Sequence, residues 1–600
     1  MKKLKMGKYL SFMMCIALLS GLLQINMYGR DIGMLFPAME RSSQGNRYGY
    51  INEKGKWIVK PEYERTYPFS DEVGSVVKDN LYGLVNKQGK QILAPTYQSI
   101  SLFEDGKAVV VAEQGMGIID TKGKMLTKSF YTYVDNYQDG AAIIGVGQKD
   151  GTMLYGYLNE KSEEMIPPIY KVANAFQDEK ALVQGMDEKY HFIDKTGKVL
   201  ETVDVPIVYG YSDNRIVFGT SIGGLLGYID DKGQVVIAPM YQSASPFKEH
   251  VAIVNTSTDY KEEEMGLIDE EGTYIYPNTY NDILYLGEER VALGKAISTE
   301  EPYIGSMYAI GDIKGNRLTD FIYYGVSAYE GGMASAYDDT NTYFIDLQGN
   351  KVSNLPTVAG TGTLVKEDNV IAANVDYETS YFRPEGKVIY ETNSLIKLGK
   401  DYSIQIQKEK PNRNYLAYIP QIQGMKKREA QKKMNEQLNA WSQSELIHAK
   451  EVADSTYYSD FEVTYYKENL LVLKILSSTY PFGAAHPMPT IKTPVINLAT
   501  GEIYKLEDLF NTQKDWKGEL NTLLQEMAKK EPISDTLFSD TKVEIGENQP
   551  FYVDNEALYI YYPPYEIGPY SSGIITFRIP FTEINSIVNQ EGSLWQAIQE

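Results

Sequence analysis

Cysteine is almost absent from this chain of 600 residues, in which Cys15 is the only one. A single thiol excludes an internal disulfide and a zinc site built from thiolates, since both need more than one cysteine. Cys15 also lies in an apolar segment at the N-terminus, which we expect to be cleaved off. The mature chain would then have no thiol nucleophile, and its stability would depend on packing alone.

Histidine is nearly as scarce, with only four in the chain, at positions 191, 250, 448 and 486. They form no HExxH pattern, and no Walker loop or complete G-x-G-x-x-G motif is present. We therefore predict no metal, no cofactor and no catalytic residues, so that the protein is not an enzyme. His486 stands out because it precedes Pro487 in a Gly-Ala loop, and a hydrogen-bonding role is favoured for it over catalysis.

Long apolar runs are also missing. The longest run near the N-terminus covers residues 9–23, and Lys2, Lys3, Lys5 and Lys8 precede it. This is the layout of a secretory signal, and the run is shorter than the roughly 20 residues that span a bilayer. We predict that residues 1–29 are a signal peptide or an N-terminal anchor, with cleavage favoured. The protein would be secreted or associated with the cell envelope, and only an uncleaved anchor would tie it to a membrane.

Positive charge is in deficit, because 58 Lys and Arg face 80 Asp and Glu, for a formal net charge of −22. Such a chain repels phosphate backbones and anionic lipid headgroups. Nucleic acid is therefore not an expected partner. A partner selected by this charge would be a cation or a basic protein.

Tyrosine is abundant, with 49 residues, and many of them belong to an internal repeat. The repeat is plainest in the segment Tyr48-Gly49-Tyr50-Ile51-Asn52, which is followed by Gly55 and Pro61. Ten copies follow one another at spacings of 34 to 43 residues, and their second positions are 49, 83, 117, 156, 191, 227, 266, 309, 344 and 382. A period of this length is typical of stacked or circular repeat proteins.

Each part of the repeat has a mechanical reason. The alternating first segment predicts a strand, and its glycine allows a neighbouring backbone or ring to come close. Asn or Asp followed three residues later by Gly predicts a type I turn with a left-handed glycine, as at Asn52, Asp120, Asp230 and Asp269. Calcium binding by these residues is the alternative, but their acidic spacing is too sparse. We predict one meander of three or four strands per unit, with structural glycines at Gly49, Gly83, Gly117, Gly156, Gly227 and Gly266.

These repeats resemble the bacterial WG-repeat family, whose units carry an aromatic residue, Gly, an apolar pair, Asp or Asn and a second Gly, followed by Pro-x-Tyr. The resemblance covers residues 47–390 and implies β-repeats that bind a ligand or a protein, with no chemistry of their own. The predicted fold is mainly β, with tandem antiparallel meanders that form either a propeller-like ring or an open β-array. Neither arrangement is excluded by the repeat pattern.

After Tyr390 the period ends and helical spacing begins. Met434, Leu438 and Trp441 predict a helix within residues 426–449, and Trp516 to Met527 predict a second one. Runs typical of strands lie at residues 461–465, 470–476, 557–562 and 574–579. Residues 400–600 are therefore predicted to form an α+β domain.

The segments 480–487, 497–502, 506–510 and 565–573 of this domain resemble the extracellular domain DUF3298, and residues 418–422 with the helix after them resemble its companion DUF4163. Related domains occur in an anti-sigma factor that receives lysozyme and, as an accessory, in a peptidoglycan deacetylase. The resemblance implies binding without catalysis. Our candidate binding residues lie in these segments: Tyr480, Phe482, His486, Tyr565, Glu566 and Tyr570.

Three functions stay open from the sequence. The favoured one is a non-catalytic envelope protein that recognises a cell-wall glycan or another wall component, or a secreted protein; a basic protein such as lysozyme would fit the charge. The second is a peptidoglycan-active hydrolase that uses Glu507, Asp508 or Glu566, although capping by Asp508 and a loop hydrogen bond by Glu566 are the simpler roles. The third is a purely structural repeat array.

Overall fold

A computed structural model describes residues 34–258, 264–443, 454–539 and 541–599. The predicted targeting segment 1–29, with Cys15, lies outside these ranges. The chain divides into two compact units: the first holds Met1–Ala38 and Tyr48–Glu391, and the second holds Met39–Arg47 and Thr392–Glu600. Within the described ranges, none of the helices has the length and apolar character that a membrane span requires.

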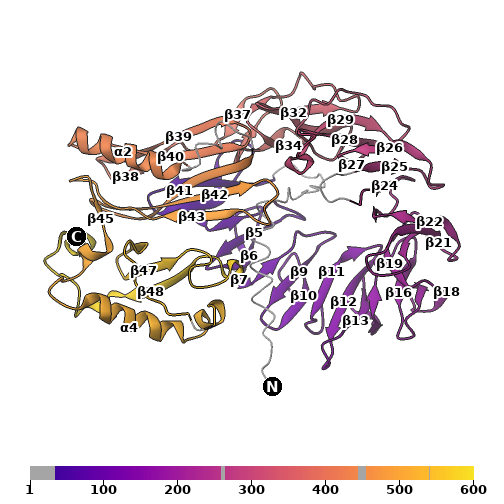
Figure 1. Ribbon diagram of the computed structural model, residues 1–600, viewed down its shortest axis with the longest axis horizontal. Coiled ribbons are helices and arrows are strands. Elements are labelled where there is room, and N and C mark those ends of the chain that lie inside the picture. The colour runs from indigo at the N-terminus through magenta and orange to yellow at the C-terminus, as the bar shows by residue number, and fades with distance from the viewer. Residues whose placement is uncertain (1–33, 259–263, 444–453, 540, 600) are drawn as a thin grey trace. The chain divides into compact units, whose positions relative to one another are not determined.

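Ten small antiparallel sheets follow one another along the chain and make up the first unit, except for residues 39–47 of the first sheet, which are assigned to the second unit (Figure 1). We number them sheet 1 to sheet 10. Their strands are β1 (Phe36–Ser42), β2 (Gly45–Ile51) and β3 (Trp57–Tyr63) in sheet 1; β4 (Arg65–Thr66), β5 (Val73–Lys78), β6 (Leu81–Asn86) and β7 (Gln91–Tyr97) in sheet 2; β8 (Ser99–Ile100), β9 (Lys107–Ala112) and β10 (Gly115–Asp120) in sheet 3; β11 (Tyr133–Gln138), β12 (Ala141–Gly147), β13 (Met153–Asn159) and β14 (Glu164–Tyr170) in sheet 4; and β15 (Val172–Ala173), β16 (Lys180–Gln184), β17 (Tyr190–Asp194) and β18 (Val199–Val203) in sheet 5.

The remaining five sheets complete the series. Their strands are β19 (Ile207–Ser212), β20 (Arg215–Gly219), β21 (Leu226–Asp230) and β22 (Val235–Tyr241) in sheet 6; β23 (Ser243–Ala244), β24 (Ala252–Asn255), β25 (Met265–Ile268) and β26 (Tyr274–Tyr280) in sheet 7; β27 (Asp282–Gly287), β28 (Arg290–Ala296) and β29 (Ser306–Asp312) in sheet 8; β30 (Gly325–Val326), β31 (Met333–Tyr337), β32 (Asn341–Asp346) and β33 (Val358–Ala359) in sheet 9; and β34 (Gly362–Glu367), β35 (Val370–Val375), β36 (Glu378–Phe382) and β37 (Val388–Tyr390) in sheet 10. The predicted mainly β fold of tandem antiparallel sheets is confirmed.

The boundaries of the sequence repeat do not coincide with the boundaries of the sheets. In sheet 2 the Tyr82-Gly83 pair lies in the third strand, β6, and Tyr97 ends the fourth strand, β7. The rest of the same sequence unit forms the first two strands of sheet 3. One unit therefore supplies strands to two sheets, whereas we expected one meander per unit. The physical reason is that the aromatic residue of the third strand packs on the following sheet.

Buried aromatic pairs join neighbouring sheets. Tyr228 of sheet 6 is fully buried, and its ring meets Phe247, which precedes β24 of sheet 7, edge to face with centroids 4.8 Å apart. Its hydroxyl donates a hydrogen bond of 2.8 Å to the carbonyl of Ser245. Burial raises the pKa of Tyr228, so the hydroxyl keeps the proton that it donates. The same geometry recurs in the pairs Tyr50 with Phe69 and Tyr157 with Phe176.

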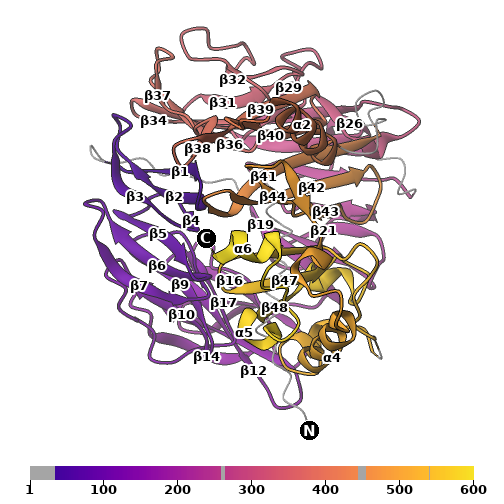
Figure 2. The ribbon, with the colours of Figure 1, turned by 90° about the vertical axis from the view of Figure 1, so that its left-hand side faces the viewer.

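The ten sheets form a closed ring. The last apolar core of the series combines Phe36 and Ile51 of sheet 1 with Val370 and Tyr381 of sheet 10. The hydroxyl of Tyr381 donates to the carbonyl of Pro37 at 2.6 Å. Figure 2 shows β1 and β2 beside β34 and β36. Of the two arrangements left open by the sequence, the structure therefore has the propeller-like ring, in which each sheet keeps its own hydrogen-bonded ladder.

The predicted turns are confirmed. At Asp230 the carboxylate accepts the amide hydrogens of Lys232 at 3.0 Å and Gln234 at 2.8 Å, and Gly233 has a φ of 79°. The same two bonds recur at Asn52, Asn86, Asp120, Asn159, Asp194, Asp269, Asp312 and Asp346. These oxygens hold the turn at the end of one strand in each of sheets 1 to 9.

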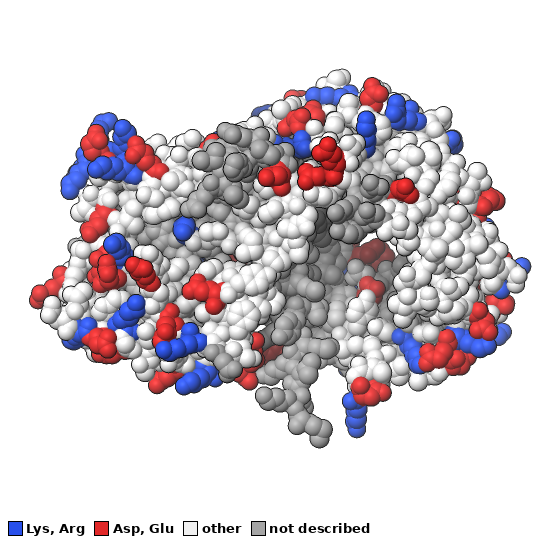
Figure 3. All heavy atoms as spheres, viewed as in Figure 1, with Lys and Arg blue, Asp and Glu red and all other residues white. Residues whose placement is uncertain are grey.

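Acidic turns between the first two strands form a second set of links around the ring. The carboxylate of Asp71 accepts the amide hydrogen of Gly106 in the next sheet at 2.7 Å. Equivalent bonds run from Glu179 to Asp139, from His250 to Asp213, from Glu289 to Glu249 and from Gly332 to Glu288. These turns therefore share one end of the ring, which we call the turn end. On the face of the molecule seen in Figure 3, acidic and basic side chains are interspersed.

The opposite end of the ring carries the connections between the second and third strands and those between sheets. We call it the loop end. Contacts there join the two kinds of connection: Glu64, between sheets 1 and 2, accepts the amide hydrogens of Asp79 and Asn80, which lie between β5 and β6. In an antiparallel meander, alternate connections must lie at opposite ends.

The second unit is the predicted α+β domain. One sheet contains β38 (Leu395–Leu398), β39 (Tyr402–Asn412), β40 (Tyr415–Gln423), β41 (Ser455–Lys467), β42 (Leu470–Pro481), β43 (Met488–Lys492), β44 (Val495–Asn497) and β45 (Glu502–Tyr504), and another contains β46 (Phe551–Val553), β47 (Ala557–Tyr562) and β48 (Ile575–Pro580). The helices are α2 (Arg428–Ser442), η3 (Leu506–Leu509), α4 (Trp516–Ala528), η4 (Ile533–Thr536), η5 (Tyr570–Ser572), α5 (Phe581–Ile584) and α6 (Ser593–Gln599). Both predicted long helices are confirmed as α2 and α4, although residues 444–449 of the first prediction lie outside the described ranges.

A short N-terminal hairpin belongs to this second unit. The guanidinium of Arg41 is buried and binds both carboxylate oxygens of Asp460, at 2.7 and 3.0 Å. It also lies over the rings of Tyr418 and Phe461, 5.4 and 5.9 Å from their centroids. A buried, bidentate ion pair is costly to break, because removal of one partner leaves the other charge without compensation. Residues 39–47 are therefore an integral part of the C-terminal fold.

Glycine at the repeat position is required by a close backbone approach. A Cβ on Gly227 would lie 2.4 Å from the carbonyl oxygen of Ile237, where the pairing of β21 with β22 shifts register. The carbonyls of Val59, Leu93 and Ile166 approach Gly49, Gly83 and Gly156 in the same way, while Gly117 and Gly266 face the side chains of Met125 and Tyr274. All six glycines predicted to be structural are thus in tight contact.

We expect Gly227→Ala to lower the free energy of unfolding of the first unit by about 2 kcal/mol or more, because the strand must move away from a backbone oxygen. Thermal or denaturant unfolding measures this effect. Gly147→Ala is the matched control, since its nearest neighbour would be a side-chain atom of Thr132 at 3.5 Å, and it should change stability by less than about 0.5 kcal/mol. Equal effects of the two substitutions would contradict the close-approach explanation.

Glu367, in sheet 10, allows a second test, which concerns how the stability of the first unit depends on pH. Both its carboxylate oxygens are buried without a hydrogen-bond partner. Burial, followed by the charges of Asp368 and Glu330, raises the pKa of Glu367 from 4.5 to about 7. Between these values the folded chain holds a proton that the unfolded chain has lost, so stability falls as pH rises. Glu367 also raises the pKa of Tyr381, the residue that closes the ring, although burial of Tyr381 is the larger cause.

We expect the melting temperature of the first unit to fall between pH 5 and pH 8, with a loss of up to about 3 kcal/mol from Glu367. Glu367→Gln should remove this part of the pH dependence, because the amide cannot ionise. Glu330→Gln, at a neighbouring acid, should leave most of it in place. Wild type and Glu367→Gln with the same dependence over this range would show that the buried carboxyl does not titrate there.

Candidate functional site

Two loops of the second unit bring three of the predicted binding residues together. His486 lies in the loop between β42 and β43, and Tyr565 and Tyr570 lie in the loop between β47 and β48. The imidazole stacks on the Tyr570 ring with centroids 3.7 Å apart and an angle of 19° between the planes. The Tyr565 ring centroid is 6.1 Å from that of His486 and 5.9 Å from that of Tyr570. We call these three residues the aromatic cluster.

Hydrogen bonds use both nitrogens of His486. Nδ1 lies 3.2 Å from the carbonyl oxygen of Pro487, which can only accept, so this nitrogen carries the proton. Nε2 then accepts from the hydroxyl of Tyr565 at 2.9 Å. The hydroxyl of Tyr570 donates to the same Pro487 carbonyl at 2.7 Å. With both nitrogens engaged, His486 holds two rings in place, which is the hydrogen-bonding role expected from the sequence.

The backbone of Tyr565 is strained. Its φ is 71°, in the left-handed region that a bulky residue rarely adopts, and 51% of its side chain is exposed. Its amide donates to the carbonyl of Gly568 at 3.0 Å, and a Cβ on Gly568 would lie 2.3 Å from the carbonyl oxygen of Thr536. The anchored loop therefore holds an aromatic ring in solvent at a cost in backbone energy. Strain of this kind is concentrated at functional sites.

Exposed apolar side chains accompany the cluster. Met488 follows Pro487 directly, and the Phe538 amide donates to the carbonyl of Ile567 at 3.1 Å, beside the Tyr565 loop. Both side chains are exposed. Large exposed apolar groups next to polar ring edges are typical of surfaces that bind a ligand. The cluster can stack on the apolar face of a ring and accept or donate hydrogen bonds at its rim.

The other predicted site residues lie apart from these contacts. Tyr480 and Phe482 stand where the His486 loop begins, and the Phe482 amide donates to the Asp454 carbonyl at 2.9 Å. Glu566 follows Tyr565 and is exposed, and partial desolvation raises the pKa of its carboxyl. Among the described residues, the hydrogen bonds and ring contacts of the cluster do not extend to these three.

The carboxylates proposed for a hydrolase have structural partners. Asp508 accepts the amide hydrogen of Lys505 at 2.7 Å and caps η3, as the simpler interpretation predicts. A carboxylate oxygen of Glu507 lies 3.7 Å from the Lys505 ammonium. The described residues contain no group of three or more His, Cys, Asp or Glu side chains that could hold a metal ion.

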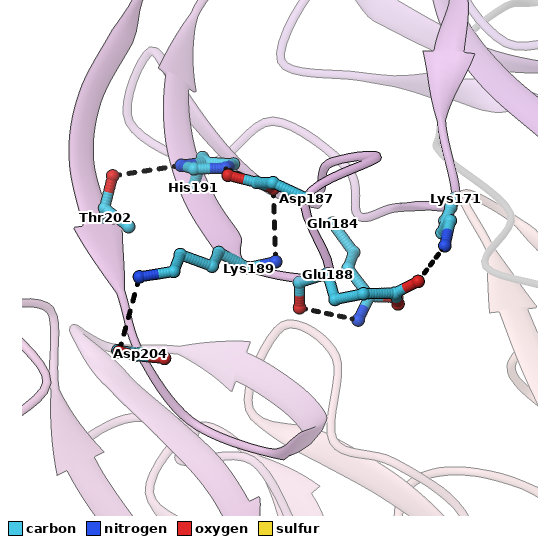
Figure 4. Close-up of polar contacts among 8 residues, drawn as sticks. All are labelled: Lys171, Gln184, Asp187, Glu188, Lys189, His191, Thr202 and Asp204. Carbon is cyan, nitrogen blue, oxygen red and sulfur yellow. Dashed lines mark hydrogen bonds and ion pairs between the residues drawn. The ribbon is translucent and has the colours of Figure 1, made fainter.

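A histidine of the ring lies in a different polar network, drawn in Figure 4. Nδ1 of His191 is 3.0 Å from the Thr202 hydroxyl, and Nε2 is 3.1 Å from the Asp187 carboxylate. This order of groups is that of a hydrolase triad, but His191 and Thr202 are direct partners in the ladder between β17 and β18, and Thr202 is exposed on the strand surface. The contact follows from strand register and needs no catalytic role.

The segment Gly219-Thr220-Ser221-Ile222-Gly223 fits the G-x-S-x-G pattern of serine hydrolases. In those enzymes the serine stands on a turn from a strand to a helix. Here the segment joins β20 to β21, two adjacent antiparallel strands of sheet 6. The strand-to-helix context is missing at this position, so the match is a hairpin loop.

Comparison with known families identifies two parts of the chain. A family model described as a WG containing repeat matches residues 48–82, 82–113, 116–149, 155–190 and 227–256, which lie in sheets 1 to 7. A model described as a protein of unknown function, DUF3298, matches residues 507–582. This second match includes Tyr565 and Tyr570 of the aromatic cluster, whereas His486 precedes it.

No curated protein matches the chain. Among solved structures, a DUF3298 family member from Bacteroides fragilis is 19% identical and aligns with 34% of this chain and 98% of its own, with a TM-score of 0.27. A DUF3298 family protein from Pseudomonas aeruginosa is 17% identical over 31% and 94% of the two chains, with a TM-score of 0.24. AztD from Citrobacter koseri is 13% identical over 60% and 94%, with a TM-score of 0.26. With TM-scores this low, the similarities support neither a fold nor a function.

The resemblance of residues 418–449 to DUF4163 stays a prediction. Repeats and a domain of the matched kinds fit a non-catalytic binding or repeat protein. The N-terminal part of the chain therefore contains WG repeats, and its C-terminal part contains a DUF3298 domain.

Proposed function

We propose that this protein is a non-catalytic binding protein of the cell envelope and that its second unit holds the ligand at the aromatic cluster. The observation that carries the proposal is the exposed, strained Tyr565, whose hydroxyl is held by His486 at 2.9 Å. A ring fixed in this way loses little entropy when a ligand stacks on it. The targeting pattern of residues 1–29 supports a location outside the cytoplasm.

Two ligand classes remain in the proposal. A cell-wall glycan suits the cluster, because sugar rings offer an apolar face for stacking and hydroxyls for the ring edges. A basic secreted protein such as lysozyme suits the net charge of −22. The cluster favours the glycan, since it contains stacked rings and a histidine instead of a group of carboxylates.

The contacts of the candidate catalytic residues are less compatible with a hydrolase than with a binding protein. Asp508 caps a helix, Glu507 lies beside Lys505, and both nitrogens of His486 are engaged. A glycosidase needs two carboxyl groups on opposite sides of the scissile bond. Partial burial raises the pKa of the third carboxylate considered, that of Glu566.

We expect purified wall fragments to bind the full chain, and Tyr565→Ala to weaken this binding about tenfold, which corresponds to about 1.4 kcal/mol for the loss of one stacked ring. A pull-down with insoluble wall and a titration with soluble fragments both measure the change. Tyr303→Ala is the matched control, because 49% of Tyr303 is exposed but it lies in the first unit. Retention of Tyr565→Ala equal to that of wild type would rule out the cluster as the glycan site.

The same samples test the other candidates. A basic lysozyme, offered at low and moderate salt, should replace the wall as ligand if the partner is a protein, and moderate salt should weaken that binding. Release of soluble fragments from the wall by wild type, abolished by Glu566→Gln, would instead support the hydrolase and overturn the non-catalytic proposal.

A further inference from the structure

The last strand of each sheet in the ring has a ladder partner on one side only, among the strands that the structure describes. Such an edge is a template for pairing with another chain, and proteins protect it with proline, with a break in the ladder or by keeping it short. Five last strands also shift register twice against their neighbours, and all five contain a proline: Pro61 in β3, Pro95 in β7, Pro167 in β14, Pro239 in β22 and Pro277 in β26.

Four other last strands are protected in different ways. In sheets 3 and 8, the strands β10 and β29 form isolated bridges with the residues that follow them: Met116 with Tyr131, Ile119 with Met125, Tyr308 with Tyr323 and Gly311 with Arg317. In sheets 9 and 10, β33 has two residues and β37 has three. The remaining last strand is β18 of sheet 5, which has five residues, no proline and one register shift against β17.

The side chains of β18 are open to solvent over most of the strand. Val199 is 49% exposed and Leu200 is 50% exposed. Glu201 and Thr202 are exposed as well, and only the last residue, Val203, is buried. β18 therefore offers a second strand both its edge and two apolar side chains.

The backbone of β18 is also oriented for such pairing. The Gly185 amide donates to the Lys189 carbonyl at 2.9 Å, where the ladder between β16 and β17 ends. Because hydrogen-bonded pairs alternate along an antiparallel ladder, His191, two residues after Lys189, also bonds toward β16. Thr202 lies opposite His191 in β18, so its amide and carbonyl point away from β17. These are the groups that a further strand uses.

The charges around β18 select the direction of pairing. Lys198 directly precedes the strand, Glu201 is its middle residue and Asp204 directly follows it. If a second copy of β18 lies antiparallel to the first, Lys198 of each copy comes near Asp204 of the other. A parallel copy would instead place like charges side by side, which is destabilising. The antiparallel arrangement retains one repulsion, between Glu201 and its equivalent.

We infer that β18 pairs with β18 of a second copy of this chain, antiparallel, and that the protein forms a symmetric dimer through this edge. A two-fold interface uses the same surface on both copies. Because the other described last strands of the ring are protected, pairing stops at two copies. The inference does not depend on the proposed function, since β18 lies in the first unit and the aromatic cluster lies in the second.

The test measures the mass of the full chain by analytical ultracentrifugation over a wide range of concentrations. We expect wild type to form a reversible dimer and Lys198→Asp to weaken it about tenfold, because both contacts between the copies become repulsive. Adding Asp204→Lys to Lys198→Asp should restore the affinity. Glu201→Gln should strengthen the dimer, since it removes the repulsion at the centre.

Lys90→Asp is the matched control. Lys90 occupies the same repeat position in sheet 2, where its amide donates to Asn86 at 3.0 Å as the Lys198 amide does to Asp194 at 3.1 Å. The strand that follows Lys90 is β7, which contains Pro95. Lys90→Asp should therefore dimerise as wild type does.

A second variant tests the backbone pairing. Thr202→Pro removes an outward amide hydrogen and should abolish the dimer, with a melting temperature within a few degrees of that of wild type. Wild type that stays monomeric at every concentration would overturn the inference. A dimer that a folded Thr202→Pro leaves intact would do the same, and so would one that Lys198→Asp and Lys90→Asp weaken equally.

Discussion

The sheets of the first unit have two apolar faces each, and three or four short strands cannot bury either face alone. Every sheet therefore needs two neighbours, and a linear series would leave two faces in water. Closure removes both exposed faces at once, through the core that Phe36 and Ile51 share with Val370 and Tyr381. The aromatic pairs, the turns and the offset of the repeat all follow from this requirement, since each of them joins one sheet to the next or holds a strand in register.

The repeat pattern predicts what is local. Gly227 and Asp230 belong to motifs whose spacing specifies a strand, a tight approach and a turn, and the structure has each of them. Closure could not be predicted, because it depends on a contact between Pro37 and Tyr381, which are separated by 344 positions. The hairpin of residues 39–47 gives no signal either, because the partner of Arg41 is Asp460, and no spacing in the sequence relates the two.

The candidate site was predictable in part for the same reason. His486, Tyr565 and Tyr570 lie in segments with a family resemblance, so they could be named from the sequence, but the stacking of His486 on Tyr570 depends on two loops that meet only in the fold. The positive φ of Tyr565 has no sequence signal, since tyrosine does not favour that region. Tyr480, Phe482 and Glu566 lie in the same segments, and their residue types do not distinguish them from the residues of the cluster. The sequence therefore could not show that the contacts of the cluster do not include them.

The net charge of −22 suggests a uniform acidic surface, but the structure divides the acids by role. In the turns, Asp230 and its equivalents satisfy amide hydrogens within a hairpin, and Asp71, Asp139 and Asp213 satisfy those of the next sheet. A carboxylate that accepts two backbone hydrogens is partly neutralised by their dipoles and contributes less to the field at a distance. The acids that remain to attract a partner are those without such contacts, so the distribution of the acids matters more for partner selection than the total charge of the chain does.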